Sequence, residues 1–92
     1  MTLELRFFAN FREAVGQKVL ERSYDGPSVP IGDVLADLEA EYPDLDFFDD
    51  DGELREYLSI LKNGQNVVHL DGLETPVGAE DRISIFPPVA GG

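Results

Sequence analysis

The chain has 92 residues, of which 42% are hydrophobic and 28% are charged, and these values predict one small folded domain rather than a disordered segment. It has no cysteine and one histidine, which excludes disulfides, thiolate metal sites and cysteine nucleophiles and argues against a histidine-based triad. Seven basic residues stand against 19 acidic ones, a net charge of −12, and nucleic acid would repel such a chain because phosphates are bound by clustered lysine and arginine.

The amino-terminal part is predicted to form two strands joined by a short connection. Residues 2–8 alternate in the manner of a strand with one buried face. The large residues on that face are Leu3, Leu5 and Phe7. One helical turn is expected over residues 11–15, before a second strand over residues 18–24. The pattern does not decide which face of this second strand is buried, because Val19 and Leu20 point in opposite directions.

One amphipathic helix is predicted over residues 31–42. Its apolar residues recur at intervals of three and four, which places them on one stripe of the helix. They are Ile31, Val34, Leu35, Leu38 and Tyr42. Pro30 suits the entry, since the first helical N–H groups lack intrahelical partners, and Pro43 ends the helix.

An acidic connection follows this helix. Residues 33–56 contain eleven acids and one base, Arg55, a balance of −10 that makes up most of the net charge. Three apolar residues are expected to hold the connection to the core: Leu45, Phe47 and Phe48. If the glycine of residues 49–52 were the sixth residue of an EF-hand calcium loop, Phe47 would be first and Leu58 twelfth. Neither side chain binds calcium, so a solvated acidic turn is favoured.

Three further strands are predicted, over residues 57–62, 65–70 and 81–86. Asn63-Gly64 indicates a hairpin between the first two, because a type I′ turn needs positive φ at both central residues. Pro87-Pro88 ends the last strand, since proline cannot donate to a strand ladder.

These elements predict an α+β domain over residues 1–88, in which one main helix crosses one face of a mixed sheet of about five strands. The other sheet face stays partly open, and Phe8, Leu61 and Phe86 fall on it. Two interpretations are open: scattered surface residues that need no explanation, and a docking patch for a partner.

Conventional catalysis has little support in the sequence. His69 is the one histidine available as a base for a serine nucleophile, and it is interpreted as a structural residue in a predicted strand. The glycines do not form a phosphate-binding loop between a strand and a helix. We therefore do not expect an enzyme.

The end of the chain is its most unusual part. Two prolines are followed by small residues that run to a carboxylate: Pro87, Pro88, Val89, Ala90, Gly91 and Gly92. Extended, these residues would reach roughly 20 Å, and glycines without Cβ atoms could thread a narrow channel. The alternative is an arbitrary glycine tail. If the carboxylate were joined to AMP as a mixed anhydride, it would become reactive, and every catalytic group would lie in a partner.

Three segments carry a resemblance to a known family. They are Phe7-Phe8-Ala9 with Arg12-Glu13 and Gly16, then Asn63-Gly64, and the run from Phe86 to Gly92. In this order they resemble the MoaD-type ubiquitin-like family over essentially the whole chain, most specifically at the terminus. The resemblance implies a β-grasp fold, with first and last strands parallel and central, and a flexible tail over residues 89–92.

The composition narrows the resemblance to one subgroup of that family. Many acids with only two lysines, Lys18 and Lys62, suggest a protein adapted to concentrated salt, where carboxylate repulsion is screened, or else an acidic docking surface for a basic partner. On the first interpretation the chain is most similar to the small archaeal ubiquitin-like modifier proteins of salt-loving archaea.

The resemblance implies a protein that is a substrate for an enzyme. An adenylating enzyme of the ubiquitin-activating type, using ATP and its own magnesium, would activate the Gly92 carboxylate. The carboxylate would then form isopeptide bonds with lysines of target proteins, or become a thiocarboxylate that donates sulfur in molybdenum-cofactor synthesis or to tRNA. Phe8 and Phe86 would help to dock the enzyme, and the apolar pattern adds Leu61. Besides the N-terminal amino group, Lys18 and Lys62 would be the internal acceptors for self-linked chains; the alternative is that both are surface lysines that serve solubility alone.

Two alternatives remain open. One is a dedicated small subunit of molybdopterin synthase, which would work with the large subunit of that enzyme. The other is a non-covalent β-grasp adaptor that uses its sheet face alone. In each case we expect a monomer that binds no metal, cofactor or nucleic acid. Because the apolar runs are short and no basic segment opens the chain, we expect no membrane span or signal peptide and a cytoplasmic location.

Overall fold

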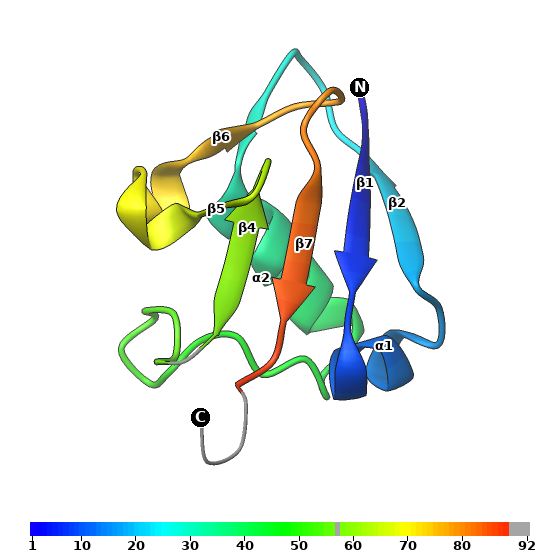
Figure 1. Cartoon of the computed structure of the whole chain (residues 1–92), viewed down its shortest axis with the longest axis vertical. Coiled ribbons are helices and arrows are strands. Elements are labelled where there is room, and N and C mark those ends of the chain that lie inside the picture. The colour runs from blue at the N-terminus through cyan, green and yellow to red at the C-terminus, as the bar shows by residue number, and fades with distance from the viewer. Residues whose placement is uncertain (57, 89–92) are drawn as a thin grey trace.

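Five strands form one mixed sheet, and the first and last of them lie side by side at its centre (Figure 1). The structure, a computed structural model, describes residues 1–56 and 58–88. The strands are β1 (Thr2–Phe7), β2 (Val19–Ser23), β4 (Ser59–Lys62), β5 (Gln65–Asn66) and β7 (Ile83–Phe86). Their order is β2-β1-β7-β4-β5, with β1 and β7 parallel and all other neighbours antiparallel. The predicted parallel pair of central strands is confirmed.

The helix α2 (Ile31–Glu41) covers one face of this sheet (Figure 1). The core between them consists of alternate strand residues and one stripe of the helix, all at most 1% exposed: Leu3, Leu5, Phe7, Ile31, Val34, Leu35, Leu38, Ile83 and Ile85. Burying a side chain of this size stabilises the fold by about 1.5–3 kcal/mol. The inner faces predicted for the first strand and the helix are therefore confirmed, and β7 buries Ile83 and Ile85, the residues that alternate with Phe86.

The ends of α2 follow the local chemistry. Pro30 is the N-cap residue, and the helix ends at Glu41, one residue before the predicted end. Tyr42 lies outside the helix and is half-buried against the core, while its N–H still donates to the carbonyl of Leu38 at 2.7 Å. Pro43 cannot continue this pattern because its ring excludes the next helical N–H group.

A second helix and a second small sheet complete the fold. α1 (Ala9–Val15) is longer than the single turn predicted, and it buries Phe11 and Val15 on one side. It ends at Gly16, whose φ of +87° suits glycine and whose N–H donates to the Arg12 carbonyl at 2.8 Å. The strands β3 (Val29–Pro30) and β6 (Pro76–Val77) pair with each other beyond the main sheet.

The hairpin after β4 is confirmed, but the strand that follows it is shorter than predicted. Asn63 and Gly64 have φ values of 52° and 86°, as a type I′ turn requires. The predicted strand ends at Asn66, whose side chain accepts a hydrogen bond from the N–H of Val68 at 3.1 Å and starts the turn η1 (Val67–His69). A further turn, η2 (Gly72–Glu74), follows. No helix among the described residues is long and apolar enough to cross a membrane.

Candidate functional site at the carboxyl-terminal end of the sheet

Two aromatic rings stack where β1 and β7 end. Phe8 follows β1 and caps α1, and Phe86 is the last residue of β7. Because these strands are parallel, their carboxyl ends meet at one edge, and the N–H of Phe8 donates to the carbonyl of Ile85 at 3.3 Å. The ring centroids lie 4.2 Å apart with an angle of 11° between the planes. Ile85 points into the core, so Phe86 and its partner lie on the sheet face opposite α2.

A positive charge accompanies this aromatic pair. The Arg12 guanidinium lies 5.8 Å from the centre of the Phe8 ring, within the range of a cation–π contact. Its Nε donates to the carbonyl oxygen of Phe7 at 3.2 Å, which fixes the side chain beside the rings. No functional role was predicted for Arg12 from the sequence. The spacing of four residues between Phe8 and Arg12 across the start of a helix is a signal that could have shown it.

Leu61 shares this sheet face but lies further from the chain end. In the antiparallel pairing of β4 with β7, Ser59 stands opposite Phe86 and Leu61 stands opposite Ser84. Directly opposite residues point to the same face, so Leu61 and Phe86 are diagonal neighbours. The structure thus brings Phe8 and Phe86 into contact and places the half-buried Leu61 diagonal to Phe86 on the same sheet face. These three residues are called the strip below.

The chain leaves the sheet next to this strip. Pro87 is buried and Pro88 is exposed, directly after the stacked Phe86. The predicted reactive terminus and its tail, Val89, Ala90, Gly91 and Gly92, lie outside the described residues. What the structure describes is therefore the base of the predicted tail, with the stacked Phe8 and Phe86 rings adjoining it.

The amino groups predicted as acceptors differ in their surroundings. Lys18 is exposed in the turn before β2. The Lys62 Nζ donates to the carbonyl oxygen of Pro76 at 2.6 Å and lies 3.9 Å from the Asp81 carboxylate. The Met1 amino group donates to the carbonyl oxygen of Tyr24 at 2.8 Å. To act as nucleophiles, the last two would first have to break hydrogen bonds.

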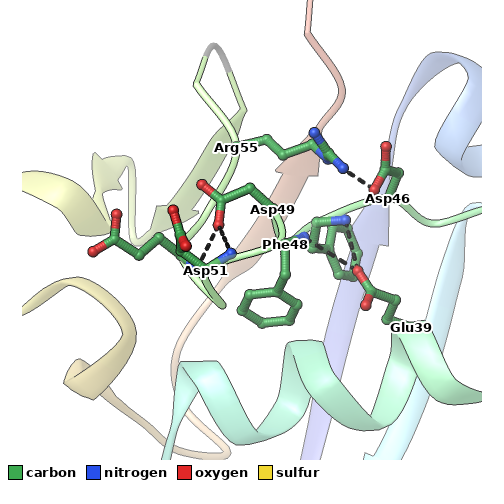
Figure 2. A network of polar contacts seen from close by, with 8 residues as sticks. Glu39, Asp46, Phe48, Asp49, Asp51 and Arg55 are labelled. Carbon is green, nitrogen blue, oxygen red and sulfur yellow. Dashed lines mark hydrogen bonds and ion pairs between the residues drawn. The ribbon is translucent and has the colours of Figure 1, made fainter.

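The acidic connection is ordered by hydrogen bonds from backbone to side chain (Figure 2). One Asp49 oxygen accepts from the N–H groups of Asp51 and Glu53, at 2.9 and 3.0 Å. One Glu39 oxygen on α2 accepts from Phe47 and Phe48, at 2.9 and 3.2 Å. As predicted, Leu45 and Phe47 are buried and Phe48 is half-buried. Among the described residues, no three histidines or carboxylates are grouped so that they could hold a metal ion.

A tyrosine links β2 to the acidic face of α2. The Tyr24 hydroxyl donates to the Asp37 carboxylate at 3.1 Å. Burial, together with this hydrogen bond and the charge of Asp37, raises the pKa of Tyr24 to about 12. The phenol therefore keeps its proton, and can donate it to Asp37, at pH values at which a free tyrosine would ionise.

Comparison with known proteins places almost the whole chain in one family. Residues 5–92 match the ThiS family. The chain is a ThiS-family protein. Small archaeal modifier protein 3 of Haloferax volcanii is 53% identical over 93 residues, covering both proteins in full. The sulfur carrier protein CysO of Mycobacterium tuberculosis is 35% identical over 81 residues, which cover 84% of this chain and 83% of CysO.

Solved structures agree with this assignment. The crystal structure of small archaeal modifier protein 1 from Haloferax volcanii matches with a TM-score of 0.81 at 33% identity, covering all of both chains. The ThiS-family protein described here thus has the ubiquitin-like β-grasp fold, as the sequence resemblance implied. Its homologues are small modifiers and sulfur carriers rather than enzymes.

Proposed function

We propose that this ThiS-family protein is a ubiquitin-like modifier and sulfur carrier whose reactive group is the Gly92 carboxylate. The observation that carries the proposal is the stacked Phe8–Phe86 pair, because it offers an apolar recognition surface directly beside the exit of the chain at Pro87. The likeness to small archaeal modifier protein 3 and to CysO supports protein modification and sulfur transfer, respectively.

The proposed chemistry begins with activation of the Gly92 carboxylate, whose negative charge otherwise repels nucleophiles. In a ubiquitin-activating-type enzyme that binds ATP and magnesium, a carboxylate oxygen attacks the α-phosphorus, pyrophosphate leaves, and an acyl adenylate forms. A target lysine then attacks the carbonyl carbon, AMP and a proton leave, and an isopeptide bond results. If hydrosulfide attacks instead, AMP leaves and a thiocarboxylate forms. The activating enzyme supplies the catalytic groups, and this chain supplies the acyl group.

The activating enzyme is proposed to dock on the strip formed by Phe8, Phe86 and Leu61. Stacked aromatic rings are rigid anchors that bury large area at little cost in side-chain entropy. Arg12 adds a fixed cation to a molecule whose net charge is −12, so an acidic group on the enzyme would be favoured opposite it.

Lys18 is the acceptor that we propose for self-linked chains. It is exposed, whereas Lys62 and the Met1 amino group donate to backbone carbonyls. A Lys18→Arg substitution should therefore remove most of the self-linked product, and the matched Lys62→Arg substitution should leave most of it. Mass spectrometry of the glycine-glycine remnants locates the linkage, and a remnant mainly on Lys62 would contradict this assignment.

The proposal is tested by incubating the full chain with the adenylating enzyme, ATP and magnesium, and measuring intact mass. We expect an AMP or sulfur adduct at Gly92, or lysine-linked conjugates when target proteins are added. Deletion of Gly91 and Gly92 should abolish every adduct without changing the melting temperature. A non-covalent adaptor would form no adduct and would keep its binding after the deletion. A dedicated molybdopterin synthase subunit would give the sulfur adduct without lysine conjugates in cells.

A further inference from the structure

A groove lies along the flank of α2, between that helix, the acidic connection and the η2 turn. Its apolar wall is made by Ala36, Phe48 and Leu73, and its volume is about 400 Å³. Phe48 and Leu73 are half-buried against the core, and Ala36 is exposed. Figure 2 shows the Phe48 ring pointing from the connection toward α2. The volume is in the range in which proteins hold small ligands or the side chains of a partner.

Two features of the fold shape this groove. A Cβ atom at Gly32 would lie 3.0 Å from both the Cβ and the carbonyl oxygen of Leu73, so the absence of a side chain lets η2 approach α2 closely. On the other side, Glu39 accepts hydrogen bonds from the N–H groups of Phe47 and Phe48 and holds the connection against the helix. Contacts with α2 thus fix both η2 and the acidic connection, the two segments that border the groove.

The rim of the groove is acidic. Asp33 and Glu74 line it, and Gly52, which also lines it, belongs to the turn of residues 49–53 with its four carboxylates. Arg55 is the one base among residues 33–56, and its Nε donates to Asp46 at 2.8 Å. An apolar groove surrounded by carboxylates favours a segment in which an apolar side chain stands next to positively charged residues.

We propose that this groove docks a protein partner through a segment in which an apolar side chain is flanked by lysine or arginine. The apolar side chain would cover Phe48, Leu73 and Ala36, and the flanking cations would face Asp33 and Glu74. Lysine and arginine also suit the groove because their aliphatic stems can lie on apolar surface while their charges stay in water.

A second copy of this chain is a poor occupant by the same reasoning. Each copy carries 19 acidic and seven basic residues, so two copies repel each other except where salt screens the charge. A basic partner is attracted by the charge that disfavours self-association.

The groove and the Phe8–Phe86 strip can be occupied at the same time. Ile83 and Ile85 of β7 are buried under α2, so the next residue, Phe86, projects to the other face of the sheet. The groove is lined by α2 and by segments on the helix side of the sheet. A partner in the groove would therefore leave both the strip and the exit at Pro87 accessible.

The test uses the full chain labelled with ¹⁵N and a synthetic peptide, acetyl-Gly-Lys-Leu-Leu-Arg-Gly-amide. We expect peptide-dependent amide shifts centred on Gly32, Gly52 and Leu73. An Ala36→Lys substitution should weaken binding about tenfold or more, because it places a like charge over the apolar anchor site. The matched control is Ala79→Lys, which makes the same change at another exposed alanine outside the groove lining; Ala40 is unsuitable because it shares the helix face of Ala36 at a spacing of four residues. The Ala79→Lys chain should bind within about twofold of the unsubstituted chain.

Two further peptides separate charge from apolar contact. Replacing both leucines by serine should abolish the localised shifts, and replacing Lys and Arg by glutamine should weaken them. Binding should weaken but persist in molar KCl, where the Debye length falls to about 3 Å.

Four results would overturn the proposal: shifts centred on Phe8 and Phe86, shifts spread over all acidic surfaces, equal weakening by the two lysine substitutions, or a peptide-independent dimer that buries Ala36. Deletion of Gly91 and Gly92 should leave peptide binding unchanged. Failure of the groove and failure of the proposed terminal chemistry are thus separate results.

Discussion

The carboxyl-terminal end of the sheet and the acidic connection on the flank of α2 are stabilised by different kinds of interaction. At the end of the sheet, strand pairing fixes the backbone, and two aromatic rings project outward from it. On the flank of α2, the large apolar side chains point inward, and carboxylates such as Glu39 and Asp49 hold the connection through backbone N–H groups. We therefore expect the half-buried aromatic pair to serve mainly in recognition, and the carboxylates that accept backbone hydrogen bonds to serve mainly in stability.

Removing one stacked ring is the strongest test of this contrast. Phe86→Ala should lower the kcat/KM of adenylation about thirtyfold, the effect of losing an interface anchor worth about 2 kcal/mol. The ring is half-buried, so the free energy of unfolding should fall by only about 1–2 kcal/mol. Pyrophosphate exchange measures the first quantity and urea unfolding the second.

Leu61→Ala provides the comparison for that substitution. Leu61 lies on the same face at a diagonal position, so its loss should reduce kcat/KM by less than the loss of Phe86. If Phe86→Ala were activated as efficiently as the unsubstituted chain, the aromatic pair would be a structural feature only.

At Glu39 we expect a loss of stability of similar size but no loss of activation. Glu39→Ala removes the acceptor for the N–H groups of Phe47 and Phe48, which should lower the free energy of unfolding by about 1–2 kcal/mol. The kcat/KM of adenylation should not change, because the strip lies on the other face of the sheet. Glu53→Ala is the matched control, since Glu53 orders the turn through its backbone groups. A loss of activation without a loss of stability would contradict this division.

Most of the fold follows from patterns that the sequence shows directly. The stripe from Ile31 to Leu38 and the alternation of Leu3, Leu5 and Phe7 fix the helix, the first strand and their buried faces. The turn at Asn63-Gly64 is encoded by its two residues alone, because few other pairs accept positive φ in succession.

The remainder depends on contacts between distant segments. The strand predicted after Gly64 ends at Asn66, because the Asn66 side chain bonds the N–H of Val68 and diverts the backbone into a turn. β3 and β6 are two residues each, and Pro30 stands opposite Pro76, so no alternation marks them. The closeness of Gly32 to Leu73 likewise appears only once the chain is folded. The sequence pattern alone places Phe8 and Phe86 on one face of the sheet, but it does not predict that their rings stack.

The smallest expected effect concerns repulsion among the carboxylates. Raising KCl from low to molar concentration should raise the melting temperature, because screening shortens the range of repulsion to about 3 Å. The combined substitutions Asp50→Asn and Asp51→Asn should raise the free energy of unfolding by a few tenths of a kcal/mol at low KCl, and by nothing measurable in molar KCl. Glu80→Gln should give a smaller gain, because Glu80 is exposed two residues from Arg82 rather than within a run of acids. A melting temperature independent of KCl would mean that these charges do not limit stability. The acidic flank would then have to be explained by partner binding alone, and the basic peptide would become the decisive probe of it.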